Sequence, residues 1–257
     1  MSVAVNFVDE GPEHGEIVVL AGSLGSTHRM WDPQVEPLVR NGFRVIRYDH
    51  RGHGDSPSPE APYTIAELGG DALALLDRIG ARRVHWVGLS LGGMVGMWLA
   101  THAADRLEKL VLCCTSAKLG PPEMWRDRAA LVRAEGTGAI ADAGVRRWLT
   151  PEFAAANPDT ANWLRDMIAA TPDEGYASSC TAIEHMDQLA DLPAITAPTL
   201  VICGAQDPST PPEGHGAEIA ARIPGARLEK LSPGAHLVNV ERPGPVSDLI
   251  VAWLEAA

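Results

Sequence analysis

Positive charge is scarce in this chain. Its 257 residues carry 21 Lys and Arg against 33 Asp and Glu, which gives a net charge of −12 at pH 7. Binding to DNA or RNA needs clustered cations that neutralise phosphates, and binding to an acidic membrane surface needs the same. We therefore expect neither nucleic acid nor a membrane as a partner.

Long apolar runs are also missing. Stretches such as residues 17–21 and 110–114 are far shorter than the roughly 20 residues that a membrane-spanning helix needs. Residues 1–11 contain two acids and no Lys or Arg, so they lack the basic start of a secretory signal. We expect a protein of the cytoplasm without a transmembrane segment.

Cysteine is sparse and forms no pattern. The four cysteines show neither CxxC spacing nor the regular series of a disulfide framework. Cys113, Cys114 and Cys203 lie in apolar runs that predict strands, and Cys180 stands alone. We interpret all four as reduced residues of the hydrophobic core.

What the chain does contain is an alternation of short apolar runs with longer stretches of helical periodicity. This alternation is typical of an α/β protein whose central, mostly parallel sheet is flanked by helices. The predicted helices include residues 65–79, stopped by Gly80, and residues 245–254. The predicted strands are residues 3–8, 16–21, 44–49, 83–89, 107–114, 199–204 and 226–231.

The alternation stops between residues 117 and 192. Only amphipathic helical stretches are seen there, separated by breaks that contain Gly or Pro. We expect a helical cap insertion at 117–192 between two parts of a core, residues 1–116 and 193–257. Trp125, Trp148 and Trp163 fall in the insertion, where they either anchor helix packing or line a pocket.

One motif carries chemistry. Gly88, Ser90 and Gly92 form G-x-S-x-G between a predicted strand and a predicted helix. In that context the motif is a sharp turn that presents a nucleophilic Ser, because only glycine fits close to the neighbouring backbone. The sequence predicts Ser90 as the nucleophile of a serine hydrolase.

A Ser hydroxyl needs a base to take its proton, and the base needs a carboxylate that holds its tautomer. Enzymes with this motif between a strand and a helix place the acid and then the His after the Ser. Asp207 follows the strand at 199–204, and His236 follows the strand at 226–231. We predict the triad Ser90, Asp207 and His236.

The other histidines are interpreted as surface or core residues. His50 and His53 raise the possibility of a metal site, but they form no H-x-H pair, and no later cluster of His and acids completes one. We expect neither a metal nor a cofactor.

A tetrahedral oxyanion needs two N–H donors. The residue after the nucleophile, Leu91, supplies one. The loop that begins at Gly22, after the strand at 16–21, points to the N–H of Leu24 as the second. Gly22 stands where such loops commonly carry His, so the residues that brace the loop must differ.

With these residues in hand, the whole chain resembles the α/β-hydrolases, and within them the 3-oxoadipate enol-lactonases of the β-ketoadipate pathway of aromatic degradation. The similarity rests on residues 23–26 (Ser-Leu-Gly-Ser), 30–34 (Met-Trp-Asp-Pro-Gln), 47–54, 62–65, 88–93, 147–153 (Arg-Trp-Leu-Thr-Pro-Glu-Phe) and 204–212. The resemblance implies that Ser90 attacks the carbonyl of 3-oxoadipate enol-lactone and forms an acyl-enzyme, which water then hydrolyses.

The substrate so implied is an anion, which a chain of charge −12 repels unless the entrance is locally positive. Residues 117–150 carry six Lys or Arg against four acids, whereas residues 151–190 carry one Arg against seven acids. We expect Arg128 or Arg133 to pair with the substrate carboxylate, and Trp125 and Trp148 to line its pocket.

Other functions stay open. A carboxylesterase, another lactonase or a cofactor-free perhydrolase shares the same fold and triad. A ligand sensor that signals to a protein partner is a further alternative. A homo-oligomer is compatible with everything above.

Overall fold

The computed structural model describes residues 2–60 and 62–256. The two predicted core segments also include residues 1, 61 and 257, which lie outside the described residues. Its centre is a seven-stranded sheet with the order β1-β3-β2-β4-β5-β6-β7. β1 is antiparallel to β3, and the other neighbouring pairs are parallel, as predicted. The strands β1 to β7 are Phe7–Glu10, Ile17–Ala21, Arg44–Tyr48, Val84–Leu89, Leu107–Cys113, Thr199–Gly204 and Arg227–Leu231.

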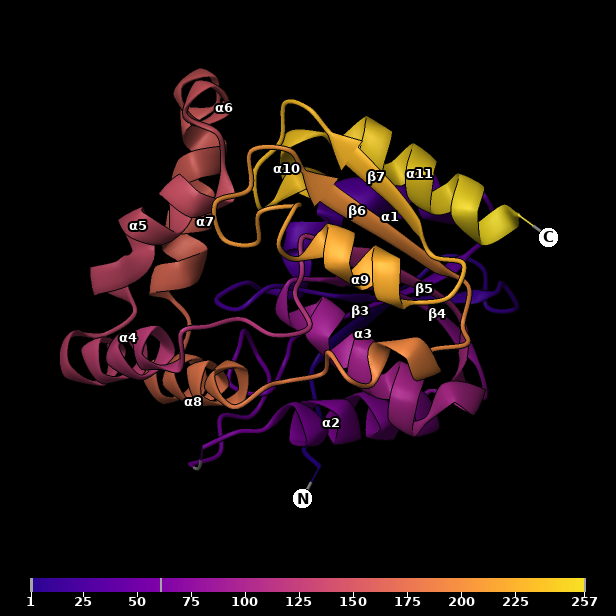
Figure 1. The fold of residues 1–257 in the computed structure, drawn as a ribbon, viewed down its shortest axis with the longest axis horizontal. Coiled ribbons are helices and arrows are strands. Elements are labelled where there is room, and N and C mark those ends of the chain that lie inside the picture. Colours follow the sequence, from indigo (N-terminus) through magenta and orange to yellow (C-terminus); the bar gives the residue numbers. More distant parts are fainter. Residues whose placement is uncertain (1, 61, 257) are drawn as a thin grey trace.

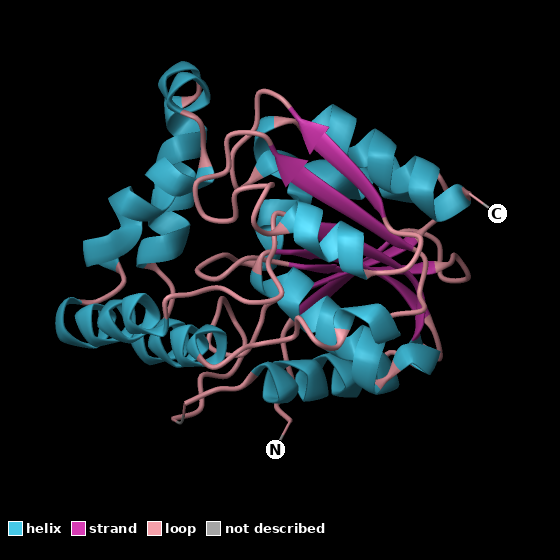
Figure 2. Ribbon diagram, in the orientation of Figure 1, coloured by secondary structure: helices cyan, strands magenta, loops and turns pink. Residues whose placement is uncertain are grey.

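Helices cover both faces of the sheet (Figures 1 and 2). α1 contacts α11 on one face, and α2 contacts α3 on the other, with α9 beside β6. The core helices are α1 Asp32–Arg40, α2 Ile65–Arg78, α3 Leu91–His102, α9 Gly216–Arg222, α10 Val238–Glu241 and α11 Pro243–Glu255, with short 3-10 turns at His28–Trp31, Ala104–Arg106 and Leu192–Ala194.

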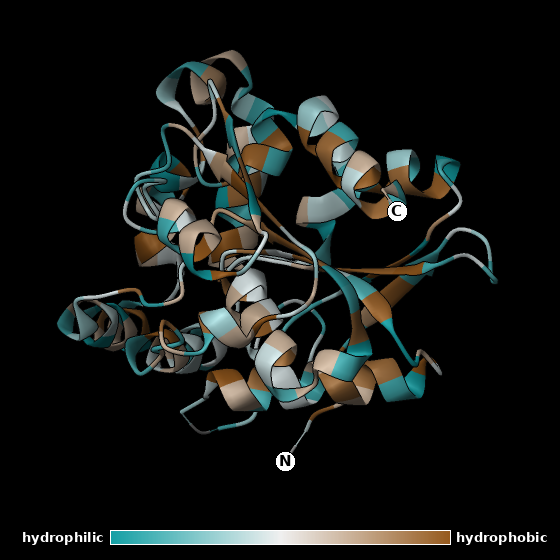
Figure 3. Ribbon diagram, turned by 45° about the vertical axis from the view of Figure 1, so that its right-hand side comes forward, coloured by the Kyte–Doolittle hydropathy of each residue, from teal (hydrophilic) through white to brown (hydrophobic). Residues whose placement is uncertain are grey.

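Burial on both faces explains the continuous apolar strands. Every residue of β4 and of β6 is buried, as expected for parallel strands between two helical layers. In Figure 3 hydrophobic residues follow the strands, whereas hydrophobic and hydrophilic residues alternate along the helices. The sheet therefore forms the centre of the hydrophobic core.

Local signals at both ends explain helix α2. Thr64 accepts a hydrogen bond from the N–H of Glu67 at 3.1 Å, and the Glu67 carboxylate accepts one from the N–H of Thr64 at 3.0 Å. This reciprocal cap satisfies two of the N–H groups that a helix start leaves open. Gly80, at a φ of +71°, follows the helix, as the sequence predicted.

The first strand differs from the prediction. The sequence placed it at residues 3–8, whereas β1 is Phe7–Glu10. The preceding backbone binds side chains instead of a strand, since Val3 N–H donates to Asp71 at 2.7 Å and Asn6 N–H donates to Ser56 at 2.8 Å. The remaining strands lie within one residue of their predicted bounds.

The predicted helical insertion separates β5 from β6. Its helices are α4 Pro122–Glu135, α5 Gly138–Trp148, α6 Pro151–Ala156, α7 Pro158–Ala169 and α8 Asp173–Glu184. α4 packs against α8, and α5 packs against α7. In Figure 1 these helices gather on the side toward which the arrowheads of β6 and β7 point. The division into separate segments at residues 117 and 192 stays a prediction.

All four cysteines are buried and free. Within the described part of the chain, no helix combines the length and the apolar character that crossing a membrane requires.

Candidate active site

Ser90 lies in the turn between β4 and α3. Its backbone has a φ of +55° and a ψ of −113°, a strained conformation for a residue with a side chain. A Cβ atom at Gly88 would lie 2.2 Å from the carbonyl oxygen of Gly92, and one at Gly92 would lie 2.2 Å from that of Ala21. The two glycines therefore let the turn pack directly on the backbone, which leaves the Ser90 side chain at the carboxyl end of the sheet.

Asp207 and His236 meet in loops after β6 and β7. Asp207 Oδ2 accepts a hydrogen bond from His236 Nδ1 at 2.8 Å. Because a carboxylate only accepts, Nδ1 carries the proton and Nε2 is left to accept one. Both side chains are buried, with residue exposures of 3%.

Further donors hold the Asp207 carboxylate. Thr210 Oγ1 donates to Oδ2 at 2.6 Å, and the N–H groups of Ser209 and Thr210 donate to Oδ1 at 2.8 and 3.1 Å. Burial by itself raises the pKa of Asp207, but the His236 ring and the Thr210 hydrogen bonds outweigh burial and lower the pKa below its usual value. Asp207 is thus an ionised partner for His236.

Ser90 and His236 line one cavity of about 130 Å³, together with Leu24 from the loop after β2. The structure thus brings the predicted nucleophile, base and oxyanion loop to the same place, with Asp207 bound behind His236. The other lining residues are Ser23, Leu119, Met124, Trp125, Arg128, Ile140, Gly144, Arg147, Trp148, Ile168, Tyr176, Ile183, Pro208 and Ser209.

Leu91 and Leu24, the two predicted oxyanion donors, lie at backbone positions that leave their N–H groups available for a hydrogen bond. Leu91 is the first residue of α3, and an α-helix leaves the N–H groups of its first turn without an intrahelical acceptor. The N–H of Leu24 has no acceptor among residues 2–60 and 62–256. Its neighbours are occupied, since Ser23 N–H faces Met30 Sδ at 3.2 Å and Gly25 N–H donates to His53 Nε2 at 3.0 Å.

Two buried histidines brace this loop. His53 Nε2 accepts from Gly25, so its Nδ1 donates to the carbonyl of Arg51 at 3.1 Å. His50 Nε2 donates to the carbonyl of Gly22 at 3.1 Å, and its Nδ1 accepts from the Tyr48 hydroxyl at 3.2 Å. Both rings are therefore neutral in this arrangement.

The electrostatics of the two rings agree with that assignment. Burial, with a contribution from the neighbouring His53, lowers the pKa of His50 to about 3, and burial also lowers the pKa of His53. With both nitrogens of each ring engaged by the protein, these residues support the loop. In the described residues no group of three His, Cys, Asp or Glu side chains could hold a metal ion.

The structure explains why Gly22 stands at the start of the loop. A Cβ atom at Gly22 would lie 2.7 Å from Ser26 Oγ and 3.1 Å from Met30 Sδ. Ser26 Oγ also donates to the carbonyl of Ser23 at 2.8 Å. Ser26 and Met30 thus occupy the space that a side chain at position 22 would need.

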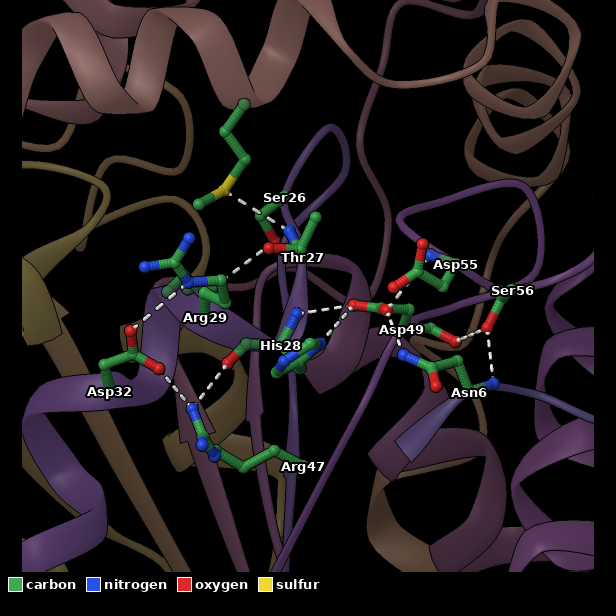
Figure 4. Close-up of polar contacts among 12 residues, drawn as sticks. Asn6, Ser26, Thr27, His28, Arg29, Asp32, Arg47, Asp49, Asp55 and Ser56 are labelled. Atoms are coloured by element: carbon green, nitrogen blue, oxygen red, sulfur yellow. Dashed lines mark hydrogen bonds and ion pairs between the residues drawn. The ribbon is translucent and has the colours of Figure 1, made fainter. Parts of the chain in front are cut away.

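Beyond the loop the chain is anchored by Asp49, as Figure 4 shows. Asp49 Oδ1 accepts from the N–H of His28 at 2.6 Å and lies 3.0 Å from its ring Nδ1, and Oδ2 accepts from Asn6 Nδ2 at 2.9 Å. Burial raises the pKa of Asp49, but these hydrogen bonds outweigh it and lower the pKa. Arg47 bridges Glu10 and Asp32 in the same network.

Two tryptophans and two arginines of the insertion form the opposite wall. Trp125 and Trp148 are buried and line the cavity, whereas Trp163 lies outside it. The Arg128 guanidinium lies over the Trp125 ring, 4.8 Å from its centroid. Arg128 and Arg147 have no carboxylate within ion-pairing distance in the described chain.

Arg147 is the charged wall residue that the sequence reasoning missed. Burial, followed by the like charges of Arg128 and Arg146, lowers the pKa of Arg147. Its position beside Trp148 in the stretch at 147–153 was the available signal. The apolar lining residues come from several helices, and only the packing of those helices reveals them.

The structure does not bring Arg133 to the cavity. Its guanidinium pairs with the Glu174 carboxylate at 2.7 Å on the surface, between α4 and α8. Arg126 pairs with Glu184 in the same way at 2.7 Å, so much of the charge asymmetry of the insertion is neutralised internally. Of the two predicted cations, Arg128 lines the cavity and Arg133 does not, and the pairing of a cation with substrate stays a prediction.

The chain is similar to known proteins over almost its whole length. Over 253 residues the chain is 38% identical to 3-oxoadipate enol-lactonase 2 of Acinetobacter baylyi, across 98% of this chain and 94% of that protein. The crystal structure of the enol-lactonase from Burkholderia xenovorans LB400 has a TM-score of 0.95 and 41% identity, over 98% of this chain and 96% of that one. A thermophilic esterase from Thermogutta terrifontis, with malate bound, has a TM-score of 0.92 and 32% identity, over 97% and 92%.

These relatives confirm the resemblance to enol-lactonases and support an enzyme of the hydrolase class. The family described as alpha/beta hydrolase fold matches residues 16–243. The chain therefore belongs to the alpha/beta hydrolase fold family.

Proposed function

We propose that this chain is a serine hydrolase that opens the ring of 3-oxoadipate enol-lactone through an acyl-enzyme on Ser90. One observation carries the choice of an anionic lactone. The cavity that holds Ser90 and His236 also holds Arg128 and Arg147, and no carboxylate of the described chain pairs with either arginine. The similarity to proteins named 3-oxoadipate enol-lactonase supports the same substrate.

The first half of the proposed reaction forms the acyl-enzyme. Ser90 Oγ attacks the lactone carbonyl while His236 Nε2 takes the Ser proton and Asp207 holds the resulting imidazolium. The carbonyl oxygen becomes an oxyanion, which accepts hydrogen bonds from the N–H groups of Leu24 and Leu91. The ring C–O bond then breaks and the leaving oxygen departs as an enolate, which takes the proton from His236.

The second half releases the product. His236 takes a proton from water, the hydroxide attacks the acyl carbon, and the same two N–H groups bind the second oxyanion. When the Ser90 ester bond breaks, His236 returns its proton to Ser90 Oγ. An enolate is a much better leaving group than an alkoxide, so the demand on His236 as an acid is modest in the first half.

The two arginines are proposed to bind the substrate carboxylate. A guanidinium presents parallel N–H donors that match a carboxylate, and this pairing is stronger in a partly buried site than in water. Trp125, which packs against Arg128, and Trp148 would cover the carbon skeleton. With a net charge of −12 on the chain, this local positive charge gives an anion a favourable place to bind.

Steady-state kinetics tests the proposal. We would compare 3-oxoadipate enol-lactone with a neutral short-chain aryl ester, using the native chain, Ser90→Ala and Arg147→Ala, with a chelator present. We expect a large preference in kcat/KM for the lactone, loss of both activities in Ser90→Ala, and a KM for the lactone that rises about tenfold in Arg147→Ala while the ester KM stays unchanged. Equal KM changes for both substrates would contradict the role of Arg147.

A carboxylesterase is the second candidate, because the malate-bound thermophilic esterase has nearly the same fold. Strong turnover of the ester with little turnover of the lactone would favour it and would keep Ser90 as the nucleophile. Inactivity on both substrates would favour a ligand sensor. The cytoplasmic location stays a prediction.

A further inference from the structure

The loop that carries His236 is tied to the insertion at two points. Leu237 N–H donates to the carbonyl of Trp148 at 2.9 Å. The Glu241 carboxylate makes the second tie: one oxygen accepts from the N–H and the hydroxyl of Thr150 at 2.6 and 2.8 Å, and the other accepts from the N–H of Ala235. Ala235 directly precedes His236, and Thr150 follows closely after Arg147.

Glu241 is an unusual residue to find in this place. It is 7% exposed, and a buried carboxylate is costly unless donors surround it. Its partners are neutral donors, and within the described residues no Lys or Arg pairs with it. Glutamine has the same shape but cannot replace it, because its amide nitrogen would face either Thr150 or Ala235, both of which donate.

We propose that Glu241 is a positioning residue that fixes the base His236 relative to the substrate-binding wall at Arg147 and Trp148. The carboxylate spans the gap between Thr150 and Ala235, and together with the backbone bond from Leu237 to Trp148 it fixes the distance between the two segments. The part of this inference that concerns binding of an anionic substrate rests on the proposed function. The effect of Glu241 on the position of His236 applies to any ester that Ser90 attacks.

The test is a double-mutant cycle between Glu241→Gln and Arg147→Ala, read with the enol-lactone and the neutral aryl ester. We expect Glu241→Gln to lower kcat for both substrates about tenfold, because His236 is misplaced for both. We also expect it to raise KM about threefold for the lactone alone. In the Arg147→Ala background this rise in KM should vanish, because it acts through Arg147.

Milder and matched variants keep the test decisive. Thr150→Ser keeps the hydroxyl bond and should behave like the native chain, whereas Thr150→Val loses that bond and should show a weaker form of the Glu241→Gln effect. Glu218→Gln removes a charge from an exposed ion pair on α9 and should leave the kinetics unchanged. If Glu241→Gln fails to fold, Thr150→Val and Thr150→Ser decide.

Two outcomes would overturn the inference. One is a variant whose melting temperature falls while kcat and both KM values stay at native levels. The other is a rise in KM that persists unchanged in the Arg147→Ala background. If the lactone is not a substrate, the proposed substrate fails, and the change in kcat for the ester still tests the link between Glu241 and His236.

Discussion

Close contacts between backbone atoms determine the conformation of the turn around Ser90. No Cβ atom fits at Gly88, which packs on the backbone of Gly92, or at Gly92, which packs on the backbone of Ala21 in the neighbouring strand. Gly92 N–H also donates to the carbonyl of Gly22 at 2.9 Å, which links the turn to the oxyanion loop. A change at Gly92 therefore reaches both the nucleophile and the donors that face it.

We predict that Gly92→Ala lowers kcat/KM at least about 100-fold and destabilises the fold by at least about 2 kcal/mol, since the new Cβ would lie 2.2 Å from the backbone oxygen of Ala21. Urea unfolding and steady-state kinetics measure the two effects. Gly70→Ala is the matched control: Gly70 lies in α2 with open space around it, so the variant should keep full activity and gain about 0.5–1 kcal/mol. Full activity in Gly92→Ala would refute the argument.

Among the helices of the insertion, α4 places its arginines in two different environments. Arg126 and Arg133, on α4, form ion pairs with Glu184 and Glu174, on α8. Arg128, on the same helix, lines the cavity instead. The orientation of α4 therefore separates cations that join two helices from a cation that faces the cavity.

We predict that Arg133→Ala leaves the KM of the anionic lactone within about twofold of native. It should cost less than about 1 kcal/mol of stability, because both partners of its ion pair are about 40% exposed, at 44% and 40%. Arg128→Ala should raise that KM about tenfold. Kinetics on the two variants, with thermal melts, tests the contrast, and the reverse order of KM changes would show that the cavity wall has been assigned wrongly.

At the scale of the whole molecule, the buried histidines couple stability to pH. The pKa of His50 is lowered to about 3 in the folded chain, whereas an unfolded His titrates near 6.5. Between these values the unfolded chain binds a proton that the folded chain does not, so stability is fully present above pH 6.5 and is lost as pH falls toward 3. His53 acts in the same direction.

We predict that His50→Gln reduces the pH dependence of the free energy of unfolding. The native chain should lose about 2 kcal/mol more than the variant between pH 7 and pH 5, because one group that takes up a proton on unfolding has been removed. Urea denaturation at both pH values, with equal slopes against urea in the two proteins, provides the comparison. Indistinguishable losses in the two proteins would mean that His50 titrates normally in the folded state.

Local patterns along the chain were enough to predict the order of strands and helices in the core, the helical stretch between β5 and β6, the turn at Ser90 and the positions of Asp207 and His236 after two strands. These features depend on local periodicity, glycine and chain order, and parallel strands bring their carboxyl ends to one edge. The start of β1 was predicted wrongly, because Asp71 and Ser56, distant in the sequence, bind the backbone of Val3 and Asn6.

Which cations face the cavity, and which residues hold the loops, became clear only from the packing of the helices. Arg133 and Arg147 both lie in predicted helical stretches of the insertion, and the sequence does not distinguish them. In the structure Arg133 forms an ion pair with Glu174, whereas Arg147 forms none with a carboxylate of the described chain. Likewise, no residue near Glu241 in the sequence indicates that Thr150 is its hydrogen-bond partner. The physical reason is that charge pairing and the satisfaction of buried polar groups depend on distances between segments far apart along the chain, and these distances exist only once the helices have packed.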